Sequence, residues 1–240
     1  MRTITCLNIR QGGGTRQRAL ADWLIGTCSD LFVLTEWRRS STEIRAALEQ
    51  AGFNRTEAIR DGKPDNGVAV FSRAEHTGTR VTPREAMRGE LLLVDVQGIR
   101  ILGAYFPQRQ AKATYFTYCA ESASKDVGPL LLIGDLNTGC NERDIESGGA
   151  PFHCEDQFIE LSEIRGLTDL WRAQRGDEAR DWTWRSPKNG FRIDHAFGNS
   201  AFVDAYPNAT CRIDHAPREM GLSDHSAVVV ELNEVARPMV

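Results

Sequence analysis

The 240-residue sequence lacks the features that mark membrane, secreted and disulfide-rich proteins. No apolar run approaches the roughly 20 residues needed to span a bilayer. No charged-then-apolar leader precedes the strand-like segment at 3–7, so we expect neither a membrane span nor a secretory signal. The six cysteines are scattered without a Cys-x-x-Cys pair, which predicts buried, reduced thiols. Together these absences predict a cytoplasmic protein.

An excess of positive charge is also lacking. Lys and Arg number 29 against 33 Asp and Glu, for a formal net charge of −4. Strong, non-specific binding of polyanions over the whole surface is therefore not expected, although a local basic track can still border an acidic site. No low-complexity linker divides the chain, so we predict a single domain covering residues 1–240.

Two common catalytic signatures are missing as well. There is no Gly-x-x-x-x-Gly-Lys-Ser/Thr loop, so the sequence gives no support for nucleotide phosphate transfer. No Ser or Cys stands in the surroundings of an activated nucleophile. The chemistry must therefore be sought among acids, amides and histidines.

Apolar and alternating segments predict a mixed sheet structure with helices. The apparent hairpin at 91–96 and 99–105, joined by Gln97-Gly98, requires antiparallel neighbours. Long polar stretches at 54–66, 73–89, 138–155 and 175–191 are expected to be functional loops. The predicted strands are 2–9, 31–35, 67–72, 91–96, 99–105, 130–134, 192–197 and 226–232, and the predicted helices are 16–26, 41–51, 110–124 and 156–165.

The segment at 130–137, with the sequence LLLIGDLN, is the most informative in the chain. A buried strand ends in Gly and is followed by Asp135 and Asn137. Because side chains alternate along an extended segment, these two are expected to point the same way, where Asp135 can take a proton from a water that Asn137 positions. A plain turn or a helix cap is the alternative reading.

Further acids and amides stand at the ends of other strands. Each alone is compatible with a turn or a salt bridge, but clustered carboxylates repel one another unless a cation or protons compensate them. An oxygen-rich ligand set favours Mg²⁺, with Mn²⁺ as an alternative, and an imidazole beside a carboxylate suits stabilisation of an anionic phosphate. The set therefore predicts metal-assisted phosphodiester hydrolysis. Its members are Asn8, Glu36, Asp135, Asn137, Asp194, Asp224 and His225.

These residues lie in short motifs that are distributed along nearly the whole chain. They are Leu7-Asn8-Ile9-Arg10, Thr35-Glu36-Trp37, Tyr105-Phe106-Pro107-Gln108, Gly134-Asp135-Leu136-Asn137, Trp182-Thr183-Trp184, Arg192-Ile193-Asp194-His195 and Ser223-Asp224-His225. The order resembles that of the endonuclease/exonuclease/phosphatase superfamily, and most closely the exonuclease III and abasic-site endonuclease branch. The resemblance implies an α/β (α+β) fold, a four-layer α/β/β/α sandwich of two packed mixed sheets.

The resemblance also implies roles for individual residues. Glu36 would be the main metal ligand, with Asp224 and Asn8 close by. Asp135 would be the base and Asn137 would help to place the water. His225 would stabilise the charge on the phosphate, oriented by Asp194, and Tyr105 would approach the phosphate or the leaving oxygen.

Substrate contacts are expected from Arg10, Arg109, Trp184 and Arg192, although Trp184 could equally be a core residue. The abasic-site enzymes carry an acid or amide at the place of Arg10, which instead resembles the deoxyribonuclease I version. Gln108 likewise replaces the usual asparagine. Abasic-site specificity is therefore not implied. Other basic residues expected near the site are Arg38, Arg39, Lys112, Arg185, Lys188 and Arg218.

The sequence thus predicts a Mg²⁺-dependent phosphodiester hydrolase, a DNA endonuclease or exonuclease related to exonuclease III. Nucleic acid, with DNA preferred, is the expected partner, DNA repair the expected setting, and no obligate protein partner is implied. The alternative is a phosphatase or phosphodiesterase acting on a small phosphoester or a phospholipid headgroup, such as an inositide or sphingomyelin. A catalytically silent binding module is disfavoured, because every acid, amide and histidine of the set is present.

Overall fold

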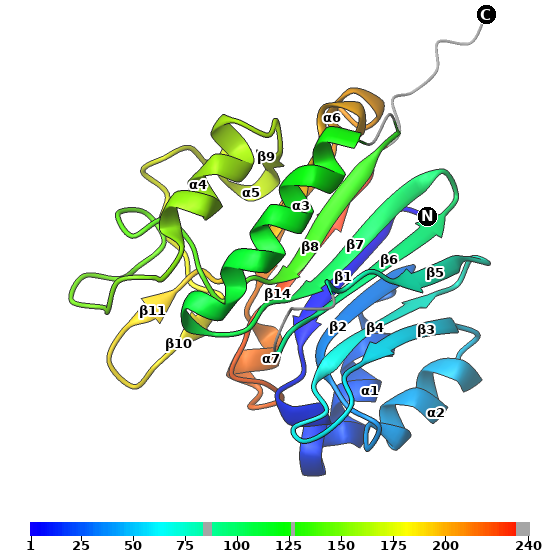
Figure 1. Ribbon diagram of the computed structural model, residues 1–240. Coiled ribbons are helices and arrows are strands. Elements are labelled where there is room, and N and C mark those ends of the chain that lie inside the picture. The colour runs from blue at the N-terminus through cyan, green and yellow to red at the C-terminus, as the bar shows by residue number, and fades with distance from the viewer. Residues whose placement is uncertain (84–87, 126–127, 234–240) are drawn as a thin grey trace, which may run out of the picture.

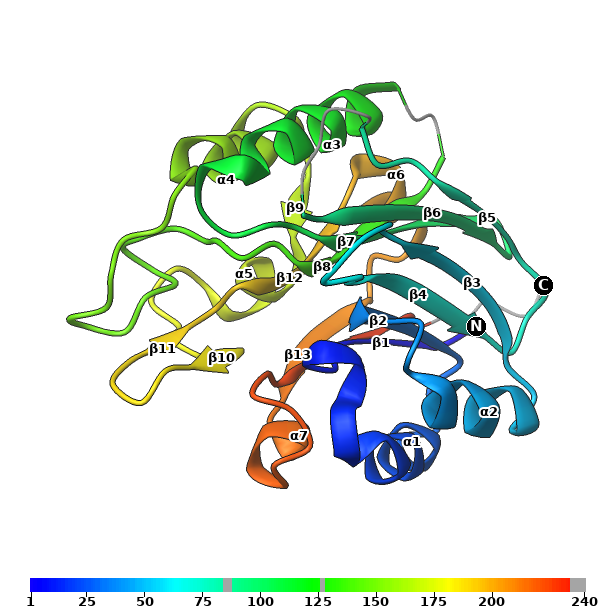
Figure 2. The ribbon, with the colours of Figure 1, turned by 60° about the horizontal axis from the view of Figure 1, so that its bottom comes forward.

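Two six-stranded sheets pack face to face in the computed structural model, which describes residues 1–83, 88–125 and 128–233 (Figure 1). Seen along the sheets, helices α3 and α4 cover one outer face, and α1 and α2 cover the other (Figure 2). The predicted α/β/β/α sandwich of two mixed sheets is confirmed.

The first sheet has the strand order β13-β14-β1-β2-β4-β3. Its only parallel pair in the described chain is β1 with β2, and the other neighbours run antiparallel. The strands are β1 (Thr3–Asn8), β2 (Leu31–Trp37), β3 (Asn54–Ile59), β4 (Gly67–Ser72), β13 (Thr210–Asp214) and β14 (Ala227–Glu231).

The second sheet has the order β5-β6-β7-β8-β12-β9 and is also mixed, with β7 parallel to β8. A separate two-stranded ribbon, β10 (Trp184–Arg185) with β11 (Gly190–Phe191), projects from one end (Figure 1). The strands of the sheet are β5 (Thr77–Arg80), β6 (Glu90–Val96), β7 (Ile99–Tyr105), β8 (Leu130–Asp135), β9 (Thr168–Asp169) and β12 (Asp194–Gly198).

The helices bury one face each against the sheets. The longer ones are α1 (Gln17–Gly26), α2 (Thr42–Gln50), α3 (Ala113–Lys125) and α4 (Glu155–Glu163). Short helices α5 (Leu170–Arg175), α6 (Ser200–Ala205) and α7 (Ala216–Glu219) fill the remaining connections, with 3₁₀ turns at Gln11–Arg16 and Arg109–Lys112. Among the described residues, none of the helices combines the length and apolarity required to cross a membrane.

Alternation along the central strands decides which side chains reach the space between the sheets. On β1, Ile4 and Cys6 belong to the core between the two sheets, whereas Leu7 belongs to the core beneath α1 and α2. On β8, Leu131 and Ile133 face the inter-sheet core, whereas Leu132 faces α3 and α4. The next inward position on β1 is Asn8, and on β8 it is Asp135, so the core gives way to polar groups at this end.

The predicted strands and the four predicted helices are present, with ends shifted by a few residues. Six strands, β3, β5, β9, β10, β11 and β13, and the short helices α5–α7 were not expected. The stretches 54–66 and 73–89, predicted as loops, contain β3 and β5. Residues 84–87 of the second stretch, and residues 126–127 and 234–240 of the predicted 1–240 domain, lie outside the described residues.

Candidate active site

Asn8 and Asp135 meet where the inter-sheet core ends. Asn8 Nδ2 donates a hydrogen bond to Asp135 Oδ2 at 2.9 Å and a longer one to Glu36 Oε1 at 3.3 Å. Asn8 has no exposed surface, and Asp135 is 1% exposed. The amide therefore joins the ends of β1, β2 and β8 and fixes the orientation of the Asp135 carboxylate.

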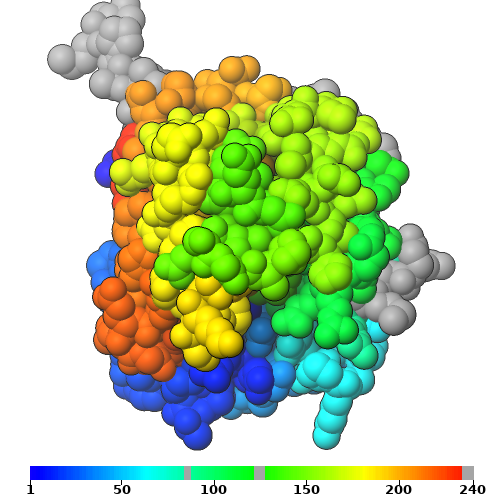
Figure 3. Space-filling view, turned by 90° about the vertical axis from the view of Figure 1, so that its left-hand side faces the viewer, coloured from blue at the N-terminus to red at the C-terminus, as the bar shows by residue number. Residues whose placement is uncertain are grey.

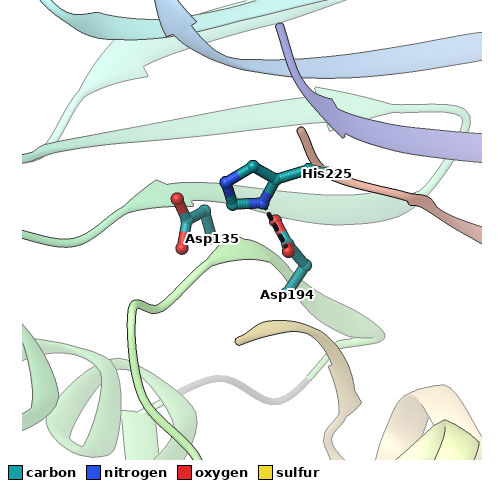
Figure 4. A group of neighbouring side chains, drawn as sticks. All are labelled: Asp135, Asp194 and His225. Atoms are coloured by element: carbon teal, nitrogen blue, oxygen red, sulfur yellow. Dashed lines mark hydrogen bonds and ion pairs between the residues drawn. The ribbon is translucent and has the colours of Figure 1, made fainter. Parts of the chain in front are cut away.

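His225 and Asp194 complete a buried group of three (Figure 4). Asp194 lies opposite Asp135 in the antiparallel β8–β12 register, and its Oδ2 accepts a 2.8 Å hydrogen bond from His225 Nδ1. One ligand atom from each of Asp135, Asp194 and His225 lies within 4.8 Å of the others. Two carboxylates and an imidazole are thus held together away from bulk water.

Burial and mutual charge shift the pKa values of this group. Burial, and then the nearby charge of Asp194, raise the pKa of Asp135 to about 7, although His225, Asn8 and the Asn137 amide pull it down. Burial alone would lower the pKa of His225, but the charge and hydrogen bond of Asp194 outweigh it and raise the pKa to about 10. Asp135 is therefore placed to exchange a proton near neutral pH, beside a cationic imidazole.

Glu36 stands at a β-bulge. The register between β2 and β4 shifts between Thr35 and Trp37, and Glu36 has a φ of 52°. An extra residue at such a site re-aims its side chain. Glu36 Oε2 accepts a 2.6 Å hydrogen bond from the Gln11 backbone, so the carboxylate is held at the mouth of the site.

Asp224 lies across from it, with 37% of its side chain exposed. Its Oδ2 accepts a 3.3 Å hydrogen bond from Trp184 Nε1 and lies 3.7 Å from Arg10 Nε. The structure gives no direct contact between Glu36 and Asp224 among the described residues; they are linked through Asn8 and Arg10, since Arg10 N donates to Asn8 Oδ1. The donor set of two partly accessible carboxylates and one amide oxygen fits a hard divalent cation.

Asn137 does not continue the alternation of β8, because the strand ends at Asp135 and Asn137 has a φ of 51°. Its backbone N–H donates to Asp135 Oδ1 at 2.9 Å, and its side-chain Nδ2 donates to the Phe106 carbonyl at 2.8 Å. The buried Lys112 ammonium binds the Asn137 carbonyl, and burial lowers the pKa of Lys112 to about 8. Asn137 therefore anchors the turn after β8 to the end of β7.

Tyr105 ends β7 and lies beside Asp135 in the parallel β7–β8 register. Its hydroxyl oxygen accepts a 3.2 Å hydrogen bond from Asn66 Nδ2, while Asn66 Oδ1 accepts a 2.6 Å bond from Arg38 Nε. Burial, and then the charges of Glu36 and Asp135, raise the pKa of Tyr105. The phenol therefore stays protonated and can donate its own proton in a further hydrogen bond.

The structure contradicts our prediction that Arg192 contacts the substrate. It is 2% exposed, and its guanidinium pairs with Asp144 and Asp169, each at 2.7 Å. The chain leaves strand geometry at 192–193, between β11 and β12, which lets Arg192 turn away from the side of Asp194. Lys112, also expected near the rim, is likewise buried.

The other three expected substrate residues, Arg10, Arg109 and Trp184, remain accessible. Arg109 is exposed and lines a cavity beside Tyr105. Trp184 is half-buried, its ring centroid 5.6 Å from that of Phe191, and its indole N–H points to Asp224. Trp184 is thus neither a core residue nor a free platform, since one edge is tied to the predicted metal ligand.

Two hydroxyl residues that support the site were not predicted. Thr183 Oγ1 accepts from the backbone N–H groups of Ile193 and Asp194 and so fixes the start of β12. Ser223 Oγ donates to the Asn8 carbonyl at 2.6 Å and accepts from the His225 backbone at 3.1 Å, joining β1 to the histidine. Thr183 stands between Trp182 and Trp184, and Ser223 directly precedes Asp224 in the predicted motifs. These positions were the signal in the sequence that could have identified both hydroxyl residues.

Several solved structures are similar to this chain over nearly its whole length. A search of curated protein sequences gave no significant match. Among solved structures, a 3′ phosphatase from Neisseria bound to a product DNA hairpin is 24% identical, with a TM-score of 0.80 over 98% of this chain and 100% of its own. A 3′–5′ exonuclease from Neisseria meningitidis is 24% identical, with a TM-score of 0.78 over 97% and 100%.

An AP endonuclease from Archaeoglobus fulgidus is 19% identical, with a TM-score of 0.76 over 98% of this chain and 100% of its own. Identities this low establish the shared fold. At the level of sequence families, residues 7–225 match the Endonuclease/Exonuclease/phosphatase family, a span that runs from the start of the first motif to His225 in the last. The chain therefore belongs to the endonuclease/exonuclease/phosphatase family and is a phosphoester hydrolase.

Proposed function

We propose that the protein is a divalent-cation-dependent DNA nuclease, an endonuclease or exonuclease related to exonuclease III. The observation that carries the proposal is the buried group of Asp135, Asp194 and His225 at the open end of two sheets, with the pKa of Asp135 raised to about 7. A carboxylate with that pKa can accept a proton from water at neutral pH and release it again.

Asp135 is the base in this proposal. It takes a proton from a water molecule, whose oxygen attacks phosphorus in line with the leaving oxygen. Asn8 Nδ2 and the Asn137 backbone N–H each hold one carboxylate oxygen at 2.9 Å, so the carboxylate is oriented before substrate arrives. The bond between phosphorus and the 3′-oxygen breaks, the released 3′-oxygen takes up a proton from solvent, and the products are a 3′-hydroxyl and a 5′-phosphate.

His225 and Tyr105 supply hydrogen bonds to the phosphate. With Nδ1 committed to Asp194, the protonated imidazole presents Nε2–H to an anionic oxygen. Tyr105 presents its hydroxyl proton, because its oxygen already accepts from Asn66. Such fixed donors stabilise the charge that develops in the transition state.

Glu36, Asp224 and Asn8 would hold the cation, for which Mg²⁺ fits best and Mn²⁺ is an alternative. When bound, the cation would neutralise charge on the phosphate oxygens and stabilise the leaving oxygen. Asn8 can serve although its Oδ1 accepts from Arg10, because an amide oxygen has a second lone pair.

DNA is proposed as the substrate for two reasons. The printed descriptions of the similar structures name a DNA hairpin product, a 3′–5′ exonuclease and an AP endonuclease. In this chain Arg10 lies at the site, exposed over half of its side chain, and Trp184 offers a half-exposed ring. A guanidinium and an aromatic ring suit the phosphates and bases of a nucleic-acid strand.

The proposal is tested with labelled DNA duplexes, intact or carrying one abasic site, incubated with Mg²⁺ or EDTA. The wild type should cut in Mg²⁺ only, and Asp135→Asn should lower turnover by about 10²–10⁴-fold. Asp204→Asn, the same change on the exposed surface of α6, is the matched control and should cut normally. Full activity in EDTA would refute the requirement for a cation. Full activity of Asp135→Asn would refute Asp135 as the base.

If the wild type cuts neither duplex, hydrolysis of inositides, nucleotides and sphingomyelin becomes the next assay. Cleavage of one of these, lost in Asp135→Asn, would retain the catalytic group and replace the substrate. The fragment pattern on DNA separates abasic incision from exonucleolytic trimming.

A further inference from the structure

The largest of the main cavities lies beside the catalytic group, on the side of β7. Its volume is about 820 Å³, within the range of ligand-binding pockets. It is bounded by the loop between β3 and β4, by Arg88, and by the turn that follows β7 from Pro107 to Arg109. The face that gathers these segments is seen in Figure 3, where the cyan stretch before β4 projects at the lower right.

This cavity is strongly cationic in a protein whose net charge is −4. Its lining carries Arg60, Lys63, Arg88 and Arg109, against the single carboxylate of Asp61. Asp61 is itself bound by Arg39 at 3.0 Å. Within the described part of the chain, Lys63, Arg88 and Arg109 have no ion-pair partner, and all three are exposed.

Unpaired cations gathered around a concave surface raise the local concentration of anions. The ordinary alternative, a set of solvated loop charges, would not require a cavity. The two observations together point to an anionic ligand larger than one phosphate.

The wall of the cavity is bonded directly to the catalytic group. Tyr105 and Asn66 line the cavity, and they are hydrogen-bonded to each other. Phe106, between Tyr105 and the lining residue Pro107, receives Asn137 Nδ2 at its carbonyl and donates its N–H to the Asp135 carbonyl at 2.8 Å. A chain of phosphates that passes Tyr105 therefore enters the cavity one strand away from Asp135.

We propose that this cavity binds substrate phosphates that neighbour the scissile one, with Lys63, Arg88 and Arg109 as their contacts. The inference rests on the proposed nuclease function and deepens it: the preferred substrate is an oligonucleotide strand, and a phosphodiester without flanking phosphates is a poor substrate. Arg10 and His225 serve the reacting phosphate, whereas the cavity serves its neighbours.

The test uses the double variant Lys63→Gln/Arg88→Gln, which leaves Arg109 and the catalytic group intact. A matched control, Arg18→Gln/Arg165→Gln, removes one surface arginine from α1 and one from the turn that follows α4. Binding of a fluorescent 15-nucleotide DNA strand is measured by anisotropy in the Asp135→Asn background, at several salt concentrations. Hydrolysis of the p-nitrophenyl ester of thymidine 5′-phosphate, which has a single phosphodiester, is measured with Asp135 intact.

The double variant should bind the strand roughly 10-fold more weakly at low salt. The slope of log affinity against log salt should become shallower by about 0.7 for each lost contact, or about 1.4 in total. Its kcat/KM on the small ester should stay within about twofold of the wild type, and the control pair should behave as wild type in both assays. A double variant with unchanged affinity and salt slope would overturn the proposal.

Because binding is measured without cleavage, the two proposals fail separately. A wild type that hydrolyses the small ester but does not cut DNA would refute the nuclease function. If the strand nevertheless binds through Lys63 and Arg88, the cavity assignment stands as a polyanion site.

Discussion

Two buried clusters in this protein use the same residue types for different ends. The first cluster contains Asp135, Asp194 and His225. The second contains Asp144, Asp169, Arg172 and Arg192. In the second cluster, burial would raise the pKa values of both aspartates, but the Arg192 charge and hydrogen bonds hold them below their usual range. In the first, burial and Asp194 raise the pKa of Asp135.

The difference lies in the balance of charge. Arg192 pairs with Asp144 and with Asp169, and Arg172 pairs with Asp144, so each carboxylate faces a guanidinium. Asp135 and Asp194 share one imidazole, and Asp194 Oδ1 is buried with no hydrogen-bond partner among the described residues. A balanced cluster holds a fold together, whereas an unbalanced one is a place for a cation, a proton or a substrate. Charge balance thus distinguishes the structural cluster from the proposed catalytic one.

Among the variants that test this difference between the clusters, His225→Ala should have the largest effect. Turnover should fall by about 10²–10⁴-fold, because the variant loses a charged donor to the phosphate, while the free energy of unfolding changes little by comparison. Steady-state kinetics on the cleaved substrate and urea unfolding measure the two effects. His76→Ala, at a half-buried histidine bonded to Thr56, is the control and should keep full turnover. A His225→Ala protein with normal kcat would place the charge-stabilising role elsewhere.

The next largest effect concerns stability. Arg192→Leu leaves two aspartates buried without their shared partner and should lower the free energy of unfolding by about 3–5 kcal/mol. Arg192→Lys keeps the charge but loses the forked arrangement of donors. Its free energy of unfolding should lie between those of the wild type and Arg192→Leu. Guanidinium unfolding measures both, with the exposed Arg18→Leu as control. A loss below about 1 kcal/mol in Arg192→Leu would mean that the cluster is not structural.

Arg192 also shows where sequence reasoning fails. We expected it at the site as a basic residue in the same motif as Asp194, and in an ideal strand residues 192 and 194 would share a face. The backbone leaves strand geometry at 192–193, so the rule of alternation does not reach Arg192. The partners that neutralise it, Asp144 and Asp169, are distant in sequence, and no local pattern announces them.

Strands that are buried on both faces were predictable, and edge strands were not. The sequences of β8 and β2 are apolar runs because one face of each strand packs against the other sheet and the opposite face packs against helices. The polar residues at their ends, Asp135 and Glu36, are therefore easy to recognise in the sequence. β5, with the sequence TGTR, is exposed along its whole length and pairs with only one neighbour, β6. β3 carries the charged residues Arg55 and Glu57, and in its sheet it pairs only with β4. Such strands are specified by pairing with their neighbours, which a local pattern does not show.

Acid should weaken the structural cluster. The pKa of Asp169 is depressed in the folded protein, so its stabilising contribution is complete above the usual value near 4 and is lost as pH falls below it. Wild-type stability should therefore drop between about pH 5 and pH 3. Asp169→Asn should be less stable at pH 7 and show a shallower drop. Urea unfolding at several pH values measures the two slopes, and parallel slopes would contradict the role of Asp169.

The smallest effect is expected at Asn66, which links the proposed catalytic cluster to the cationic cavity. Asn66 donates to the Tyr105 hydroxyl and accepts from Arg38, so the tyrosine proton is left to point at the phosphate. Asn66→Leu removes one neutral hydrogen bond and should lower kcat by about 2–12-fold, equivalent to about 0.5–1.5 kcal/mol, with KM nearly unchanged. In the Tyr105→Phe background, Asn66→Leu should have no further effect on kcat, because the oriented proton is already gone. Additive losses in the double variant would show that Asn66 acts through the cavity rather than through Tyr105.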